Sequence, residues 1–228
     1  MRLALISDVH GNLPALEAVL EDIDALGDGG VDAVACAGDV VGYGPWPSEC
    51  VERVREACSV VVQGNHDRTV QTPAEYSHNE MAMRGLEHAK RELDDEQREW
   101  LAELPPRTTV GRGRVRLVHS HPDPDQLGRY VQPSEFTGLR PYLDDYDALV
   151  LGHTHLQHEA PVDGRLVVNP GSVGQPRDRD PDAAYAVLDV DDASVDLHRV
   201  EYDVDRVIQR VEDVGLPRRI GTRLLDGS

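Results

Sequence analysis

Five short apolar segments that each run directly into polar residues constrain the fold of this 228-residue chain more than any other feature. The segments are rich in Val, Leu, Ile and Ala and predict buried β-strands; they cover residues 2–7, 33–37, 59–63, 114–118 and 148–151. Amphipathic segments at about 12–27 and 47–57 separate the first three strands and predict helices. This alternation of strand and helix predicts an α/β layer with parallel strands.

The other segments extend this plan without adding a second domain. Residues 74–104 are charged and rich in Ala, Glu and Arg, and they predict a helical cap inserted between the third and fourth strands. A final helix is expected at roughly 204–214. Hairpins of a second sheet are predicted where short apolar runs alternate with turn residues, at 165–172, 184–190 and 194–200. Without repeats or linkers, residues 1–228 predict a single domain.

Polar side chains follow the ends of all five predicted strands. The set contains carboxylates, imidazoles and one amide: Asp8, His10, Asp39, Asn65, His66, Asp67, His119, His121, His153 and His155. Ligand sites in open α/β sheets lie beyond the carboxyl ends of the strands, so we expect these side chains to gather at one edge. Because burying unpartnered polar groups costs several kcal/mol each, the set needs mutual neutralisation or a cation.

The types of donor in this set indicate transition-metal binding. Carboxylate oxygens and imidazole nitrogens without any thiolate favour manganese, iron, zinc, nickel or cobalt over calcium or a structural zinc. The donors are too many for one ion, whereas four per ion with one shared carboxylate would use seven donors and two ions. Two-metal sites of this kind serve in-line displacement at phosphorus.

The motifs carried by these residues resemble those of the calcineurin-like metallophosphoesterases over about residues 3–175. They are DxH at 8–10, GDxxG at 38–42, GNHD at 64–67, a histidine after a strand at 119, and GHTH at 152–155. The segments GDVVGYGPWPSECV and VNPGSVGQPRD resemble a small prokaryotic branch with predicted phosphodiesterases. The resemblance implies an α/β fold in which a two-sheet β-sandwich core is flanked by helices, with a small helical cap insertion.

The resemblance also implies a role for each residue of the set. Asp8, His10 and His155 would bind one metal, Asn65, His119 and His153 would bind a second, and Asp39 would bridge the two. His66 would stabilise the transition-state charge and protonate the leaving oxygen, with Asp67 orienting its ring. A hydroxide bridging two divalent ions would be the nucleophile. Manganese is the favoured ion, with nickel, iron, cobalt and zinc as alternatives.

The fourth motif departs from the pattern of the family. Most members have HG or GH there, whereas this chain reads VHSHP with Ser120 between two histidines. We expect His119 to be the ligand because it directly follows the strand, with His121 as the alternative.

Several functions fit this set of residues. The first expectation is a phosphodiesterase acting on a small phosphoester such as a nucleotide; dinucleoside tetraphosphate hydrolysis and protein phosphatase activity are the enzymatic alternatives. A non-catalytic scaffold of the same fold is the alternative from another class, and the intact GNHD and GHTH motifs disfavour it. Two aromatic residues, Tyr43 and Trp46, are expected either to stack on a base or to pack. The run Arg177-Asp178-Arg179-Asp180 is expected to be a solvated loop, with phosphate contact by one of its arginines as the alternative. Homo-oligomerisation is compatible with all of these functions.

The charge of the chain limits its partners. Its 42 acidic residues against 23 basic ones give a formal charge of −19, and Lys90 is the only lysine. Such a surface disfavours nonspecific binding to nucleic acid or anionic membranes. The acid-rich, lysine-poor composition resembles cytosolic proteins of halophiles, in which molar salt screens the self-repulsion. Three cysteines without metal-binding spacing, and no apolar run of membrane-spanning length, predict a soluble cytoplasmic protein.

Overall fold

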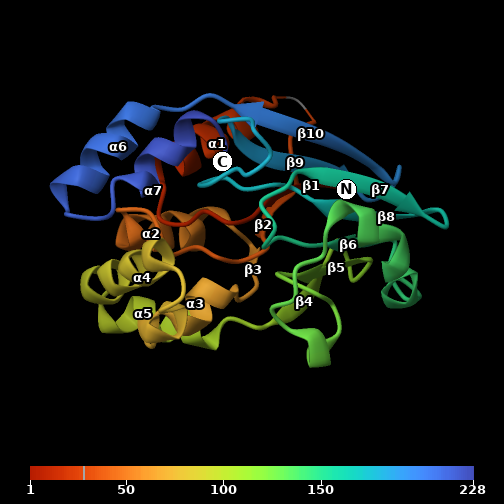
Figure 1. Cartoon of the computed structure of the whole chain (residues 1–228). Helices are drawn as coiled ribbons and strands as arrows, with labels where there is room; N and C mark the ends of the chain where they lie inside the picture. The colour runs from red at the N-terminus through yellow and green to blue at the C-terminus, as the bar shows by residue number, and fades with distance from the viewer. Residues whose placement is uncertain (28) are drawn as a thin grey trace.

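Two mixed five-stranded sheets packed face to face form the framework of the molecule (Figure 1). The computed structural model describes residues 1–27 and 29–228. The first sheet has the order β10–β9–β1–β2–β3, with β1 (Arg2–Ile6), β2 (Ala33–Cys36), β3 (Val60–Val61), β9 (Ala183–Asp189) and β10 (Ser194–Val200). The second has the order β4–β5–β6–β8–β7, with β4 (Arg107–Val110), β5 (Val115–Val118), β6 (Ala148–Val150), β7 (His158–Val162) and β8 (Arg165–Asn169). This confirms the expected two-sheet core flanked by helices.

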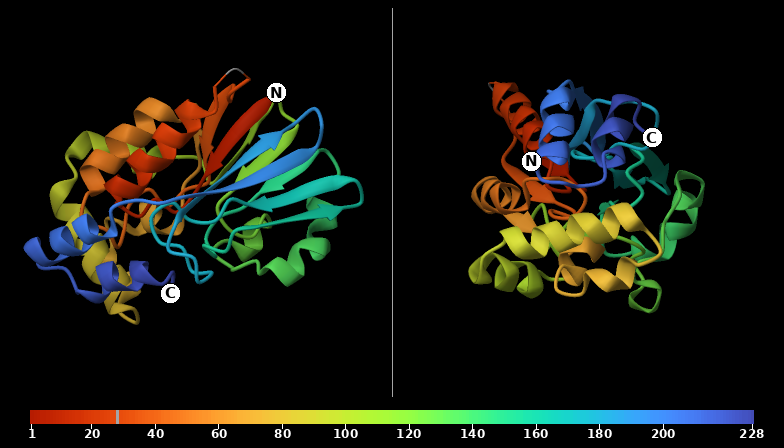
Figure 2. Two further views of the ribbon diagram at one scale, coloured as in Figure 1. Left: turned by 90° about the horizontal axis from the view of Figure 1, so that it is seen from above. Right: turned by 60° about the vertical axis from the view of Figure 1, so that its left-hand side comes forward.

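The helices lie on the outer faces of the two sheets (Figure 2). The α-helices are α1 (Leu13–Ala25), α2 (Pro47–Ala57), α3 (Asn65–Thr69), α4 (Glu80–Glu92), α5 (Asp95–Glu103), α6 (Val204–Asp213) and α7 (Arg219–Thr222). Shorter 3-10 turns are η1 (Pro73–Tyr76), η2 (Pro124–Gln126), η3 (Pro133–Tyr142) and η4 (Arg223–Leu225). The predicted first helix begins after Asn12, whose side-chain oxygen accepts a hydrogen bond from the Ala15 amide.

Side-chain alternation along β1 shows how the layers are held together. Leu3 and Leu5 belong to the apolar cluster between the two sheets, whereas Ala4 and Ile6 belong to the cluster under the helices. Successive side chains of a strand point to opposite faces, so one strand serves both clusters. A third cluster, which includes Phe136 and Val167, lies between the second sheet and η3. The result is a four-layer arrangement of helix, sheet, sheet and helix.

The predicted place of the last hairpin was wrong. The hairpin β9–β10 was expected in the second sheet, but it joins the first, with β9 antiparallel to β1. The reason lies in the burial of β9, in which every residue before Asp189 is buried. A strand covered on both faces fits the centre of a sheet. The strands β5 and β6 belong to the second sheet. The edge strands β4 and β7 and the short helix α7 were not predicted.

Residues 74–104, predicted as a cap, fold mainly as η1, α4 and α5. Leu86 and Ala89 of α4 and Leu101 of α5 belong to the same apolar cluster as α1 and α2. The helix α4 approaches the loop after β2 so closely that a Cβ atom at Gly85 would lie 2.3 Å from the Tyr43 amide nitrogen. These helices therefore extend the helical layer, while η1 reaches the carboxyl edge of the first sheet.

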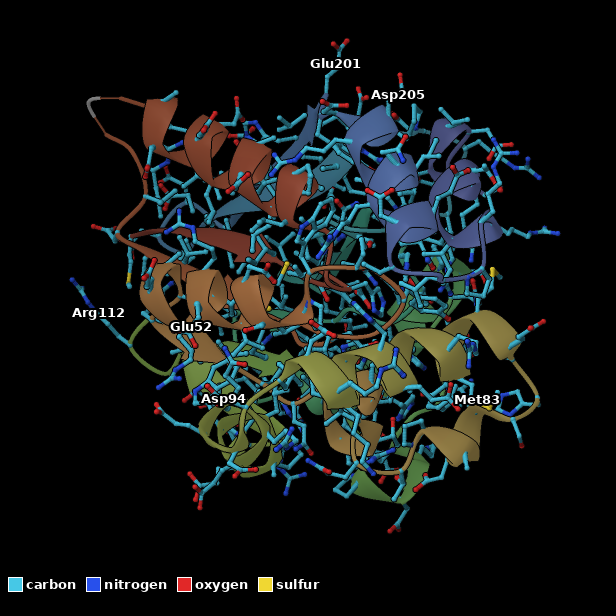
Figure 3. All side chains as sticks on the ribbon, turned by 90° about the vertical axis from the view of Figure 1, so that its left-hand side faces the viewer. Glu52, Met83, Asp94, Arg112, Glu201 and Asp205 are labelled. Atoms are coloured by element: carbon cyan, nitrogen blue, oxygen red, sulfur yellow. The ribbon has the colours of Figure 1, made fainter. Side chains whose placement is uncertain are left out.

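Acidic side chains lie on the surface of the molecule. Figure 3 shows Glu52 of α2, Asp94 before α5, and Glu201 and Asp205 near the start of α6 at this surface, in keeping with the formal charge of −19. In the described part of the chain, no helix combines the length and apolarity needed to cross a bilayer.

Candidate metal centre

The carboxyl ends of strands from both sheets bring the predicted site residues together. The loops that follow β1, β2, β5 and β6 supply most of them, and the start of α3 supplies the rest. All but one of the predicted ligands are buried, at 0–7% exposure: Asp8, His10, Asp39, His119, His153 and His155. The remaining one, Asn65, is half-buried. The residues thus converge as expected, but from two sheets that face each other rather than from one.

The backbone at these residues adopts an uncommon conformation. Asp8, His10, Asp39, His153 and His155 all have φ between 50° and 70°. This left-handed region is unfavourable for residues with a side chain and persists only where the surrounding structure enforces it. Half of the ten non-glycine residues with positive φ in the described ranges are therefore predicted ligands. Such a concentration of backbone strain is typical of functional sites.

Each predicted histidine ligand has one ring nitrogen bound to a backbone carbonyl. The contacts are His10 Nδ1 to Val41 O (3.1 Å), His119 Nδ1 to Ala37 O (2.7 Å), His155 Nδ1 to Gln175 O (2.6 Å) and His153 Nε2 to Gly128 O (3.0 Å). A carbonyl oxygen can only accept a hydrogen bond, so the ring nitrogen that contacts it carries the hydrogen. In the neutral ring, the other nitrogen then has a free lone pair. This is the arrangement that metal-binding imidazoles require.

One group of donors consists of Asp8, His10 and His155. Their ligand atoms lie close together, with His155 Nε2 3.2 Å and His10 Nε2 3.7 Å from Asp8 Oδ1. The two imidazole Nε2 atoms are 3.1 Å apart. Asp8 Oδ1 is buried and has no hydrogen-bond partner among the described residues, whereas Oδ2 accepts from Ser7 and from the His153 amide. An orphaned carboxylate oxygen facing two imidazole lone pairs fits a cation.

The second group surrounds Asp39. His119 Nε2 lies 3.3 Å from Asp39 Oδ2 and 3.0 Å from Asn65 Oδ1, and His153 completes a set of neighbouring donors. Asp39 also lies 3.7 Å from His10 Nε2 of the first group, so its carboxylate is adjacent to both. The chemistry of this donor set, two carboxylates with imidazoles and one amide, fits divalent transition metals.

Burial and charge shift the pKa values of the candidate histidine ligands in different directions. Burial lowers the pKa of His10 well below its ordinary value and that of His153 to about 4, which keeps both rings neutral. Burial acts in the same direction on His119, but the charge of Asp39 outweighs it and raises the pKa to about 9. Because a histidine binds a metal as the neutral ring, a cation bound beside Asp39 would displace the proton from His119.

The structure separates the two histidines of the fourth motif. His119 faces Asp39, whereas Nδ1 of His121 accepts a hydrogen bond from the Asp123 amide and its ring lies edge-on to Tyr142. Among the described residues, His121 belongs to none of the groups of neighbouring donors. The geometry favours His119 over the alternative.

The expectation that Asp67 orients the His66 ring was wrong. Nδ1 of His66 is buried and has no hydrogen-bond partner among the described residues. The Asp67 carboxylate instead accepts hydrogen bonds from four backbone amides, those of Asp39, Val40, Val41 and Gly64, at 2.8–3.2 Å. Asp67 thus ties the loop after β2 to the start of α3. The ring of His66 is positioned by packing, with ring centroids 4.8 Å from Tyr76 and 4.9 Å from Tyr43.

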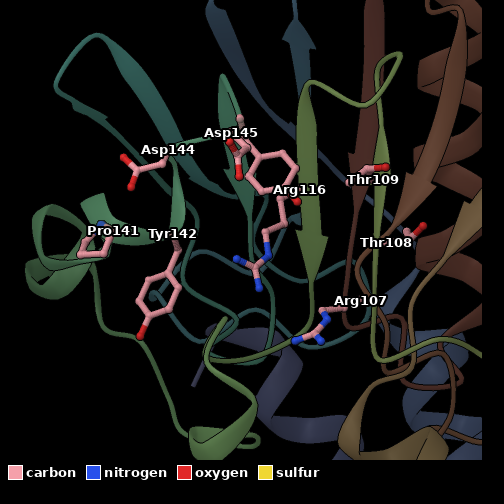
Figure 4. Close-up of a pocket in the computed structure, with 9 residues that line it drawn as sticks. Arg107, Thr108, Thr109, Arg116, Pro141, Tyr142, Asp144 and Asp145 are labelled. Carbon is pink, nitrogen blue, oxygen red and sulfur yellow. The ribbon is translucent and has the colours of Figure 1, made fainter.

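A cavity of about 330 Å³ opens in front of these residues. Its wall contains Asp39, Asn65, His66, His153 and His155, together with residues that the sequence did not single out as site residues, including Tyr76, His78 and Tyr130. A larger groove of about 570 Å³ lies beside β4 and is lined by residues such as Arg107, Arg116 and Tyr142 (Figure 4), but none of the predicted ligands contributes to it. Size alone therefore does not identify the site.

Of the tyrosines on the cavity wall, Tyr76 and Tyr130 were not predicted, because they come from segments far apart in the chain. Tyr43 follows β2, Tyr76 belongs to η1 and Tyr130 lies between η2 and η3. Tyr43 was considered as a residue that stacks on a base or packs, and its 4% exposure with ring contacts to His10 and His66 shows that it packs. Trp46 packs as well, with 8% exposure in the cluster under the helices.

The fold and the paired groups of carboxylates and imidazoles define a class of metal-dependent phosphoester hydrolases. Residues 1–193 match the calcineurin-like phosphoesterase superfamily domain, and the chain belongs to this family. The resemblance noted from the five motifs is confirmed over most of the chain.

Individual relatives cover nearly the whole chain. An uncharacterized protein of Methanocaldococcus jannaschii, MJ0912, is 33% identical, with 99% of this chain and 98% of that protein covered. The phosphodiesterase YfcE of Escherichia coli K12 is 29% identical over 86% of this chain and 91% of its own length. The crystal structure of a metallophosphoesterase from Sphaerobacter thermophilus is 35% identical and covers 100% of both chains with a TM-score of 0.82. The hypothetical protein PH1004 of Pyrococcus horikoshii shares the fold, with a TM-score of 0.85, 23% identity and coverage of 100% and 98%.

Proposed function

We propose that the protein is a dinuclear phosphodiesterase whose ligands are Asp8, His10, Asp39, Asn65, His119, His153 and His155. The observation that carries this proposal is the position of Asp39 between two groups of donors: it lies 3.7 Å from His10 of the group of Asp8, His10 and His155, and 3.3 Å from His119 of the group that includes His153. One ion would be held by Asp8, His10, His155 and Asp39, and a second by Asp39, Asn65, His119 and His153. Manganese is the preferred candidate, because carboxylate, amide and imidazole donors without thiolate suit it.

The metals, when bound, would neutralise phosphate charge and lower the pKa of the attacking water. The chain supplies the other functions. The backbone carbonyls behind the four imidazoles fix their orientation, so that the ligand atoms do not have to reorganise during turnover. The Asp39 carboxylate is itself held in a fixed orientation, because its Oδ1 accepts a hydrogen bond from the His66 amide at 2.8 Å while its Oδ2 faces His119.

His66 is the proposed general acid. Its ring lies between Tyr43 and Tyr76 on the wall of the cavity, beside the Asp39 carboxylate but not within the two ligand groups as assigned above. An imidazole in this position can stabilise negative charge on a transferring phosphoryl group and donate a proton to the leaving oxygen. The absence of a hydrogen-bond partner for Nδ1 among the described residues leaves packing to hold the ring.

A phosphodiester is the favoured substrate because the related Escherichia coli protein is a phosphodiesterase. We infer a single domain over residues 1–228 in which the segment 74–104 shapes the entrance, since Glu75, Tyr76, His78 and Asn79 line the cavity. We also infer an intracellular enzyme adapted to high salt, on the basis of the formal charge of −19 and the single lysine.

The test is metal reconstitution followed by elemental analysis and a substrate panel. The stripped protein is loaded in turn with Mn, Ni, Co, Fe, Zn and Mg, and is assayed on monoesters, diesters and dinucleoside polyphosphates. We expect two ions per chain and preferential hydrolysis of diesters. One ion per chain, or a preference for monoesters in every metal form, would contradict the proposal.

Asp39→Ala provides the matched variant, because the shared carboxylate serves both groups. We expect this variant to lose both ions and all metal-dependent turnover, whereas Asp24→Ala, which removes an exposed carboxylate of α1, keeps both. Retention of two ions by Asp39→Ala would show that the bridging assignment is wrong.

A further inference from the structure

The guanidinium of Arg177 lies on the wall of the cavity without an anionic partner. Its polar contacts among the described residues are made by Nη2, which donates to Gln175 Oε1 at 2.7 Å and to Tyr43 Oη at 3.4 Å. Both acceptors are neutral. Nε is buried and has no hydrogen-bond partner in the described part of the chain. Arginine carries five N–H donors and a permanent charge, so most of its binding capacity is unused here.

The backbone fixes Arg177 relative to the candidate metal centre. Its amide donates to the carbonyl of His155 at 3.3 Å, and the carbonyl of Gln175, two residues earlier, accepts from His155 Nδ1 at 2.6 Å. Arg177 and His155 also line the same cavity. Arg177 is therefore held at the mouth of the first group of donors.

Arg177 forms no ion pair with a carboxylate among the described residues. By contrast, Arg199 of β10 pairs with Asp178, the residue that follows Arg177. Unpaired arginine next to a cavity favours an anion as its ligand, because the planar fork of N–H groups matches the oxygens of a phosphate. The side chain of Arg177 is thus available to a substrate.

Aromatic rings flank the same cavity on its other sides. The ring of Tyr130 stacks on that of His153, with centroids 4.1 Å apart and planes 10° apart, yet 48% of Tyr130 is exposed. On the wall formed by η1, Tyr76 packs against His66 and carries the ring of His78 stacked at 5.8 Å. Exposed aromatic faces beside a phosphate site are suited to stack on a flat organic group.

We propose that Arg177 binds a non-bridging oxygen of the substrate phosphate and that Tyr130 stacks on a flat ring of the same molecule. The substrate class is then an aromatic phosphodiester, of which nucleoside diesters are one case. This inference rests on the proposed function for the position of the phosphate, and it adds two binding residues that do not ligate metal.

The Arg177 half of the proposal is tested by binding of inorganic phosphate to the metal-loaded protein, measured by calorimetry. We expect Arg177→Gln to raise the Kd for phosphate by about tenfold or more, since a charge-assisted pair is lost. Arg177→Lys should restore part of the affinity because it keeps the charge without the planar fork. Arg179→Gln is the matched control, because it removes a charge from an exposed position of the same loop.

The Tyr130 half is tested with a nucleoside monophosphate as a second ligand. We expect Tyr130→Ala to weaken binding of the nucleotide by about tenfold while binding of inorganic phosphate is unchanged. Tyr130→Phe should bind both ligands as the wild type does, because the ring is retained. Equal weakening of both ligands by Tyr130→Ala would overturn the stacking assignment.

Metal content and thermal unfolding of each variant show whether the site and the fold are intact. If Arg177→Gln keeps its metals and its unfolding midpoint but binds phosphate as tightly as the wild type, the phosphate contact is wrong. If the wild type hydrolyses no diester at all, the proposed function fails, but the differences in ligand binding between variants still answer the present inference. On bis(p-nitrophenyl) phosphate we expect Arg177→Gln to raise KM and lower kcat/KM.

Discussion

Backbone strain and carbonyl contacts fix the individual residues of the candidate metal centre. Five predicted ligands have positive φ, and four imidazoles each bind a backbone carbonyl through one nitrogen. The positive φ values cost free energy, and the carbonyl contacts restrict rotation of the imidazole rings. Both features direct the donor atoms towards the candidate metal centre. Single residues of the candidate site can therefore be tested for separate roles.

Replacement of His66 by Ala separates catalysis from metal binding. Because His66 acts on the substrate and not on the metals in our proposal, His66→Ala should retain its metals and lose about 10²–10⁴-fold in turnover of a diester. Elemental analysis and steady-state kinetics measure the two quantities. His198→Ala, a histidine of β10 stacked on Tyr185, is the matched control. Wild-type rates in His66→Ala would show that the general-acid role is wrong.

Replacement of Asp67 by Asn tests its role as a structural acceptor. The buried carboxylate accepts four backbone amides, and an amide side chain would turn an N–H group towards two of them. We expect Asp67→Asn to lower the free energy of unfolding by about 2–4 kcal/mol, seen as a lower thermal midpoint. If activity fell while the midpoint stayed the same, Asp67 would have a catalytic role that the hydrogen bonds do not indicate.

At the scale of elements, short strands and tight loops decide how closely the ligands approach one another. The ligands that follow β1 lie in the turn at 8–10, and the ligand that follows β2 lies in the loop at 38–42. Backbone amides of this loop donate hydrogen bonds to the Asp67 carboxylate of α3. The connection between β3 and α3 passes directly over Asp39. Residue 64 must be a glycine, because the backbone there lies so close to the Asp39 carboxylate that a side chain has no room.

Gly64→Ala is predicted to disrupt this approach. A Cβ atom at residue 64 would lie 2.0 Å from Asp39 Oδ1, so the carboxylate or the start of α3 must move. We expect loss of metal affinity together with a drop in stability of about 1–3 kcal/mol, measured by metal titration and by thermal unfolding. The matched control is Gly138→Ala, where an added Cβ meets nothing within 4 Å. Unchanged metal binding in Gly64→Ala would contradict the close packing.

At the scale of the whole molecule, the net charge is the feature that most affects stability. A formal charge of −19 on one domain disfavours the compact state through self-repulsion, and salt screens this repulsion over about 3 Å at 1 M. Many of the basic residues form surface ion pairs, such as Arg53 with Glu56 and Arg84 with Glu87, which contribute little each. Stability should therefore depend strongly on the ionic medium.

The thermal unfolding midpoint is expected to rise as KCl increases to molar concentrations. The physical reason is screening of repulsion between carboxylates, which matters more in the compact state than in the unfolded chain. A neutral solute at matched osmolality serves as the control, since it excludes volume without screening charge. A midpoint independent of KCl, or equal effects of the salt and the neutral solute, would contradict the adaptation to salt.

The sequence by itself predicted the candidate ligands and the helices that precede or follow them. Asp8, Asp39 and His153 could be predicted because each directly follows an apolar strand, and a strand and the turn at its end depend on a few neighbouring residues. Helices at 13–25 and 47–57 could be predicted for the same reason, since their periodicity is local. The two-sheet core followed from the family resemblance of these local motifs.

Only the tertiary structure decided which sheet each strand joined, what Asp67 binds and which aromatic residues line the cavity. Strand partners, as for β9 beside β1, depend on which faces of distant segments are buried together. Asp67 accepts amides from residues 26–28 positions away in addition to Gly64, and Tyr130 meets His153 across the cavity. These are contacts between segments far apart in the chain, and the free energy that selects them comes from packing and desolvation, which local sequence patterns do not encode.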